Sequence, residues 1–147
     1  MRNYEDLEVW QKAHALTILL YRITERFPRA EMFGLTSQIR RAACSIGANL
    51  AEGCGRWGEA EMARYVQIAM GSASELHNHL RLSRDLEFMD QDDYCASSQA
   101  VTGVRQMLTA FLQTLRQKRP IAKSAPLLAK SEERRAKNEI VASGAAL

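Results

Sequence analysis

The sequence lacks the features that mark membrane, secreted and metal-stabilised proteins. No stretch approaches the roughly 18 consecutive apolar residues of a membrane span, and the start, MRNYED, lacks the apolar centre of a secretory signal. Cys44, Cys54 and Cys95 are odd in number and show no C-x-x-C spacing, so neither a disulfide framework nor a zinc site is expected. We expect a cytoplasmic protein without a cofactor, whose cysteines serve as small packing residues.

Most of the chain also lacks a net positive charge. The net charge is +3, but the first 118 residues hold 14 basic and 14 acidic side chains. The whole surplus therefore lies after residue 118, and the overall charge does not predict that the folded part binds nucleic acid. The chain is long enough for one domain with its own core.

Alternating runs typical of β-strands are missing, and apolar residues instead recur at helical spacing. Thr36 and Asp90 are expected to cap the second and fourth helices, whereas Pro28, Gly53 and Gly55 are expected to end the first two. The pattern predicts helices from about Asp6 to Phe27, Thr36 to Gly53, Glu59 to Phe88, and Asp90 to Leu115.

Short connections between these helices predict an all-α, antiparallel, up-down-up-down four-helix bundle over residues 1–118. Trp10 falls on the apolar stripe of the first helix, and Ile68 and Leu82 widen the stripe of the third. Residues 119–147 hold few large apolar side chains, so we expect a disordered, flexible basic C-terminal tail there.

The second helix carries two neighbouring stripes of opposite chemistry. At about 100° per residue, an apolar arc runs along one side of this helix. Such a helix packs in a bundle and also meets a second partner. Small residues such as Gly47 and Ala48 allow another backbone to approach closely, either within the bundle or from another subunit. The apolar arc comprises Ile39, Ala42, Ala43, Ile46, Leu50 and Gly53, and the adjacent polar stripe comprises Arg41, Ser45, Asn49, Glu52 and Arg56.

The polar stripe is the one close polar constellation in the sequence, and it does not favour catalysis. It has no histidine base, nucleophile pair or phosphate-binding loop, so we expect no enzyme. Pairing of Glu52 with Arg56, and bonding of Asn49 to nearby backbone, is the structural interpretation. An enzyme that uses Glu52 with Arg41 and Arg56 is the least favoured hypothesis.

Glu75 and His79 lie four residues apart, but such a pair indicates a metal site only if a third ligand joins it. The sequence places none beside them, so we expect an ordinary contact on a helix surface and no metal site.

Clustered arginines give the better functional candidate, because the guanidinium group suits bidentate phosphate contacts. Interleaved acids such as Glu25 and Asp85 favour a solvated, salt-bridged face for any one cluster. In a ring, repetition would join such patches into a basic band. The candidate nucleic-acid-binding residues are Arg22, Arg26, Arg29, Arg40, Arg81 and Arg84.

Several irregularly spaced motifs agree with one known family. The block LTSQIRRAACSIGANLAEGCGR (35–56) is preceded by YEDLEVWQKA (4–13) and followed by IAMGS (68–72). Over roughly residues 4–118, the chain resembles the small four-helix-bundle proteins found as open reading frames in intervening sequences of bacterial 23S ribosomal RNA genes.

The resemblance implies a four-helix bundle that associates into a ring-like pentamer. A similar protein, the accessory variability protein of diversity-generating retroelements, forms a basic pentameric barrel that binds nucleic acid and a reverse transcriptase. We therefore expect a non-enzymatic homopentameric scaffold for RNA or DNA, with a protein partner such as a reverse transcriptase and no role in a membrane. The alternative is a protein-only adaptor with no nucleic-acid role.

Overall fold

The computed structural model describes residues 2–118 and 134–138. In this part of the chain every regular element is helical, which confirms the predicted all-α class. The predicted disordered tail lies mostly outside the described residues, of which 134–138 form an exposed helical turn. The elements in chain order are η1 (Tyr4–Asp6), α1 (Glu8–Thr24), η2 (Arg29–Glu31), α2 (Leu35–Cys54), α3 (Glu59–Asp85) and α4 (Gln91–Gln117).

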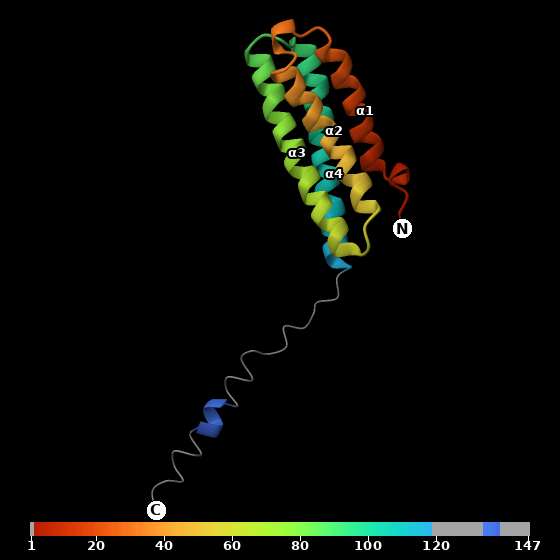
Figure 1. Cartoon of the computed structure of the whole chain (residues 1–147), viewed down its shortest axis with the longest axis vertical. Helices are drawn as coiled ribbons and strands as arrows, with labels where there is room; N and C mark the ends of the chain where they lie inside the picture. The colour runs from red at the N-terminus through yellow and green to blue at the C-terminus, as the bar shows by residue number, and fades with distance from the viewer. Residues whose placement is uncertain (1, 119–133, 139–147) are drawn as a thin grey trace, which may run out of the picture.

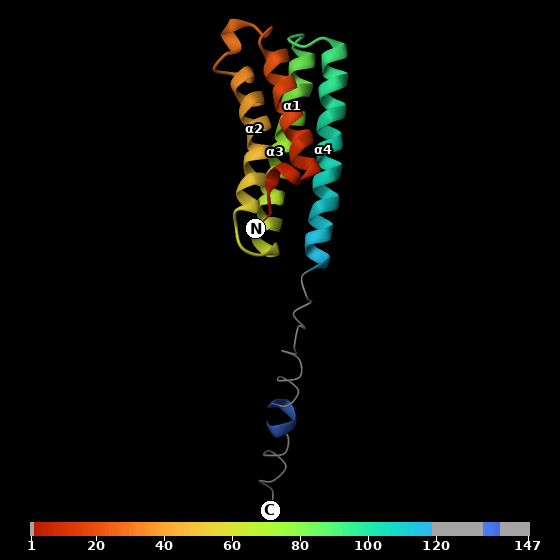
Figure 2. The same ribbon diagram turned by 90° about the vertical axis from the view of Figure 1, so that its right-hand side faces the viewer.

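Four antiparallel helices form an elongated bundle (Figures 1 and 2), as the short connections predicted. Around the bundle, α1 lies beside α2 and α4, and α3 lies beside the same two helices. The α1–α2 and α3–α4 connections meet at one end, and the α2–α3 connection lies at the other. None of the helices in the described residues is long and apolar enough to cross a membrane.

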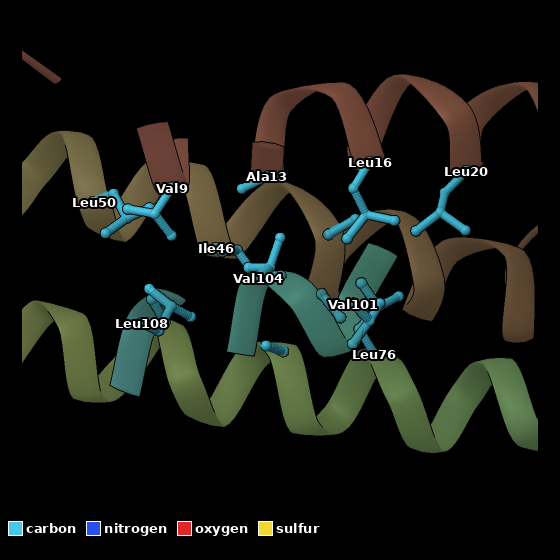
Figure 3. Close-up of a cluster of buried hydrophobic side chains, with 14 of the residues drawn as sticks. Val9, Ala13, Leu16, Leu20, Ile46, Leu50, Leu76, Val101, Val104 and Leu108 are labelled. Carbon is cyan, nitrogen blue, oxygen red and sulfur yellow. The ribbon is translucent and has the colours of Figure 1, made fainter. Parts of the chain in front are cut away.

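Large aliphatic side chains from all four helices fill the interior of the bundle (Figure 3). Leu20, Ile46, Leu76 and Val101 are inaccessible to solvent, and each comes from a different helix. Burial of such side chains supplies about 1.5–3 kcal/mol apiece relative to exposure. The helical spacing of the apolar residues therefore places one continuous core along the axis of the bundle.

Local capping confirms one sequence prediction and corrects another. The Asp90 carboxylate accepts a hydrogen bond from the Asp93 backbone N–H at 2.8 Å and caps α4 as predicted. Thr36 does not cap α2, because the helix begins one residue earlier, at Leu35. The Glu31 carboxylate instead accepts from the Leu35 N–H at 3.0 Å.

Two helices end earlier than predicted. α1 stops at Thr24, because the N–H groups of Arg26 and Phe27 turn back to Ile23 and Thr24 in a tighter turn. α3 stops at Asp85, since Glu87 adopts a positive φ of 62°, a conformation that closes helices. These terminal turns are local backbone choices that apolar spacing does not encode.

The glycines predicted to end α2 serve different purposes. Gly53 lies inside the helix and does not end it, whereas Gly55 caps it in a right-handed conformation. A Cβ atom on Gly53 would lie 2.8 Å from Met62 Sδ and 2.9 Å from Tyr65 Cβ. Gly53 is therefore required for the close approach of α2 to α3.

The cysteine prediction holds only for Cys54, which is buried. Cys44 and Cys95 are exposed, so they are not packing residues, and all three thiols are free.

We predict that Gly53→Ala destabilises the bundle, because Met62 and Tyr65 must shift to admit the methyl group. The expected loss in the free energy of unfolding is about 1–3 kcal/mol. Gly103→Ala is the control, since its Cβ would meet nothing within 4 Å, and it should gain about 0.5–1 kcal/mol from helix propensity. Chemical denaturation followed by circular dichroism measures both, and equal effects would contradict the steric argument.

Candidate functional site

The centre of the polar stripe faces α3. Ser45 Oγ and Ser72 Oγ share a hydrogen bond of 2.8 Å across the two helices. Asn49 Nδ2 donates to the Ser45 carbonyl at 2.7 Å and to Ser45 Oγ at 3.0 Å. The second partner of α2, which the two-stripe pattern predicted, is thus a helix of the same bundle at Ser45. The predicted bond of Asn49 to nearby backbone is confirmed.

The polar stripe forms a small charged cluster at the C-terminal end of α2. The Glu52 carboxylate accepts hydrogen bonds from Arg56 Nη2 at 2.8 Å and from the Tyr65 hydroxyl at 2.9 Å. The guanidinium of Arg56 also lies 5.7 Å from the centre of the Tyr65 ring. The Arg56 hydrogen bond, followed by that of Tyr65, lowers the pKa of Glu52. The predicted pairing of Glu52 with Arg56 is confirmed.

Arg41 does not join this cluster. It lies about three helical turns from Glu52 along α2 and is exposed, and its side chain has no hydrogen bond or ion pair within the described residues. The structure therefore does not bring together Glu52, Arg41 and Arg56, the three residues of the catalytic hypothesis.

The six candidate arginines gather at the end of the bundle where the α1–α2 and α3–α4 connections meet (Figure 1). We call this region the arginine end. Its two sides differ in charge, because residues 22–41 hold five arginines and two glutamates, whereas residues 81–93 hold two arginines and five acidic side chains. The α1–α2 side is therefore basic, and the α3–α4 side is acidic.

On the basic side, the arginines differ in how they are held. Arg26 Nη2 pairs with Asp93 at 2.6 Å. Arg40 donates to Thr24 Oγ1 at 2.9 Å, and its guanidinium lies 4.5 Å from the centre of the Tyr21 ring. Arg22 and Arg29 have no side-chain hydrogen bond or ion pair within residues 2–118 and 134–138.

On the acidic side, Arg81 and Arg84 surround Tyr94. Arg84 pairs with Asp85 at 2.9 Å, and its guanidinium lies 4.4 Å from the Tyr94 ring centre. Burial by itself raises the pKa of Tyr94, but hydrogen bonds to Arg81 and Ser98, together with the nearby arginine charges, lower it overall. These two arginines serve local contacts as well as facing solvent.

An open apolar groove of about 630 Å³, which the sequence pattern did not predict, lies between α1 and α2. Trp10 was expected in the core, but it is half-buried at the groove wall, where its ring stacks on His14 at a centroid distance of 4.8 Å. Ile18 and Tyr21 interrupt the polar face of α1 and are both exposed. These two residues were the sequence signal for the groove, which we call the α1–α2 groove.

Glu75 and His79 contact each other, with His79 Nε2 3.3 Å from Glu75 Oε1. No cluster of three potential metal ligands occurs among the described residues. The neighbouring His77 points to Ser98 on α4, at 3.3 Å, and burial is the main cause that lowers the pKa of His77.

The arrangement defines a small antiparallel four-helix-bundle protein without a visible catalytic constellation in its described residues. The family model of the 23S rRNA-intervening sequence protein matches residues 5–110, and the chain belongs to this family. The resemblance drawn from the motifs is thereby confirmed.

One solved structure is a protein of unknown function from the S23 ribosomal protein family of Bacteroides thetaiotaomicron VPI-5482. It is 22% identical to this chain, with a TM-score of 0.67, over 71% of this chain and 95% of the other. A sequence identity this low supports a shared fold and nothing about function. No curated protein matches the chain, and the similarity to the accessory variability protein stays a prediction.

We predict that the Glu52 carboxyl titrates below its ordinary pKa, because Arg56 and Tyr65 stabilise the charged form. A lowered pKa in the folded state stabilises the fold above the unfolded-state pKa, and this contribution is lost as the pH falls through the folded-state value. NMR titration of the Glu52 side chain should show its pKa rise in Arg56→Gln/Tyr65→Phe. Arg29→Gln, at the opposite end of the bundle, should leave the pKa unchanged, and an unmoved pKa in the double variant would contradict the assignment.

Proposed function

We propose that the protein is a non-enzymatic scaffold that assembles as a homopentamer and binds RNA or DNA through the basic side of its arginine end. The observation that carries this proposal is that Arg22, Arg26, Arg29 and Arg40 all come from the α1–α2 side of one end of the bundle, where Arg26 reaches across to Asp93 of α4. These residues support a local excess of positive charge although the first 118 residues are neutral as a whole.

The kind of cation supports a phosphate ligand. Between Lys12 and Lys118, every basic side chain other than histidine is an arginine, whose planar fork matches phosphate oxygens. Arg29 is free of side-chain pairing in the described residues. The Arg26 side chain remains 65% exposed in its ion pair with Asp93, and such pairs contribute little free energy. Both side chains are therefore available to a polyanion.

Assembly into a ring would give this modest patch its strength. The pentamer is what the family resemblance implies, and several exposed apolar residues on the bundle support self-association. Five basic surfaces on one particle would add their weak contacts through multivalency. The cytoplasm is the compartment that we propose for this particle, and a reverse transcriptase is the protein partner that the resemblance favours.

The proposed assembly predicts a particle of about five times the chain mass of 16.5 kDa. Light scattering coupled to size-exclusion chromatography measures this mass directly. A monomer at micromolar concentration would eliminate the pentamer.

The proposed ligand predicts binding that weakens steeply with salt, because neutralised phosphates release counterions. Fluorescence anisotropy with a structured RNA and with duplex DNA measures the slope of affinity against salt concentration. Arg26→Gln/Arg29→Gln should flatten this slope by about one unit per lost phosphate contact. The matched control, Arg105→Gln/Arg116→Gln, removes the same charge from exposed positions on α4 and should leave the slope unchanged.

Equal binding by both double variants would overturn the basic side of the arginine end as the site, and no binding at low salt would remove the nucleic-acid role. The second candidate function, a protein-only adaptor, would then stand. The apolar α1–α2 groove and the neutral balance of the first 118 residues favour it. A protein partner that stays bound after nuclease treatment would identify this class.

A further inference from the structure

We infer that the α1–α2 groove of one copy receives the exposed apolar side chains of α3 from a second copy of this chain. The inference rests on the proposed self-assembly and names its contact surfaces. It is supported by the open floor of the groove, by matching apolar side chains on α3, by a charged pair and by the position of the two faces around the bundle.

Small residues of α2 form the floor of the groove. Gly47, Ala48 and Ala51 line it, between walls that include Trp10 and Ile18. A Cβ atom on Gly47 would lie 3.5 Å from Trp10 Nε1, which is ordinary van der Waals contact. The packing of the bundle itself therefore does not require glycine at this position, where glycine costs about 1 kcal/mol relative to alanine. Access for a neighbour explains the missing side chain.

The α3 helix carries the matching convex surface. Ile68, Leu82 and Leu86 are 43%, 45% and 49% exposed, and we call them the α3 ridge. Ile68 and Leu86 are 18 residues apart, which is five helical turns, and Leu82 lies one turn from Leu86. Helical spacing places Ile68 and Leu82 on a broad apolar stripe of α3, but the bundle leaves them uncovered.

The groove and the ridge lie at the same levels along the bundle. The hydrogen bond between Ser45 and Ser72 sets α2 and α3 in register. Because both helices rise equally per residue, Ile68 is level with Asn49, between Ala48 and Ala51 at the floor of the groove. Two neighbouring copies with parallel axes therefore bring Ile68 against the groove without sliding.

The same register brings a second apolar pair together. Leu82 and Leu86 are level with the connection between α1 and α2, where Met32 and Phe33 are exposed, Phe33 at 94%. Parallel copies would cover all four side chains, so the apolar match extends beyond the groove.

Charge complementarity agrees with this register. Glu75 lies on α3 between Ile68 and Leu82, level with the end of the groove that Arg22 lines. Its side chain is 54% exposed. Arg22 lines the groove and has no side-chain hydrogen bond or ion pair within the described residues. An ion pair between Glu75 of one copy and Arg22 of the next places Arg22 in the contact between copies and leaves Arg26, Arg29 and Arg40 for the nucleic acid.

The ridge lies on the side of α3 next to α2, because Ile68 is one turn from Ser72, which bonds to Ser45 of α2. The groove and the ridge are therefore on adjacent sides of the bundle, which meet at α2 (Figure 2). A contact between different faces is heterologous, so each added copy is rotated relative to the previous one in the same direction. Adjacent sides of a four-cornered bundle stand close to a right angle, so the turn is large and the series closes as a small ring. A two-fold dimer, which pairs one face with itself, does not satisfy this arrangement.

The test uses one variant on each face. Ile18→Glu charges the groove, and Ile68→Glu charges the α3 ridge. Each variant should run as a monomer in light scattering, at 16.5 kDa. An equimolar mixture should form a species of twice this mass, because the intact ridge of the first variant fits the intact groove of the second. Gln106→Glu, on the exposed face of α4, is the control and should keep the wild-type mass.

A charge exchange gives a second, milder test. Arg22→Glu should raise the protein concentration needed for assembly at least tenfold, and Arg22→Glu/Glu75→Arg should restore the wild-type value. Circular dichroism melts verify that each variant is folded, which is expected because all the changed side chains are exposed.

The outcomes separate this inference from the proposed function. A monomeric wild type defeats both the pentamer and the named contact. A wild-type assembly that survives Ile68→Glu, or a mixture of the two variants that stays monomeric, overturns the groove-and-ridge contact alone. Nucleic-acid binding by the wild type is measured separately and bears only on the ligand.

Discussion

The packing of α2 against α3 is the contact on which the rest of the structure depends. Gly53 brings the two backbones together at one end, where any larger residue would meet Met62 and Tyr65. Further along, the hydrogen bond between Ser45 and Ser72 fixes the register of the two helices. Because polar groups inside a helix contact must be paired to be tolerated, this bond also restricts which residues of α3 can face α2.

That register determines what remains at the surface. With Ser72 held against α2, Ile68 and Leu82 face outwards although their chemistry suits a core. On the other side of α2, the small residues leave the α1–α2 groove open. The bundle thus completes one core and leaves two apolar surfaces, which is typical of a chain that buries more area when it assembles. The proposed contact between copies reaches the arginine end at Arg22 and at the connection between α1 and α2.

Much of the fold was predictable, because apolar spacing reports directly on helices and their buried sides. The four helices, their antiparallel order and the cap at Asp90 follow from local pattern. The ends of α1 and α3 and the cap of α2 did not, since a single turn at Glu87 or a carboxylate from Glu31 decides them. For the site, the spacing predicted the pair Glu52 and Arg56, but it did not reveal that Tyr65 completes the cluster.

By itself, the sequence determined the helices, the two-sided chemistry of α2 and the family, because each depends on residues close together in the chain or on fixed motifs. Only the tertiary structure decided where the surfaces lie. It turned the polar stripe towards α3, separated Arg41 from Glu52, and divided the arginines between a basic and an acidic side. The physical reason is that helices at different places in the chain choose their relative rotation and level through packing, which no periodicity within one helix records.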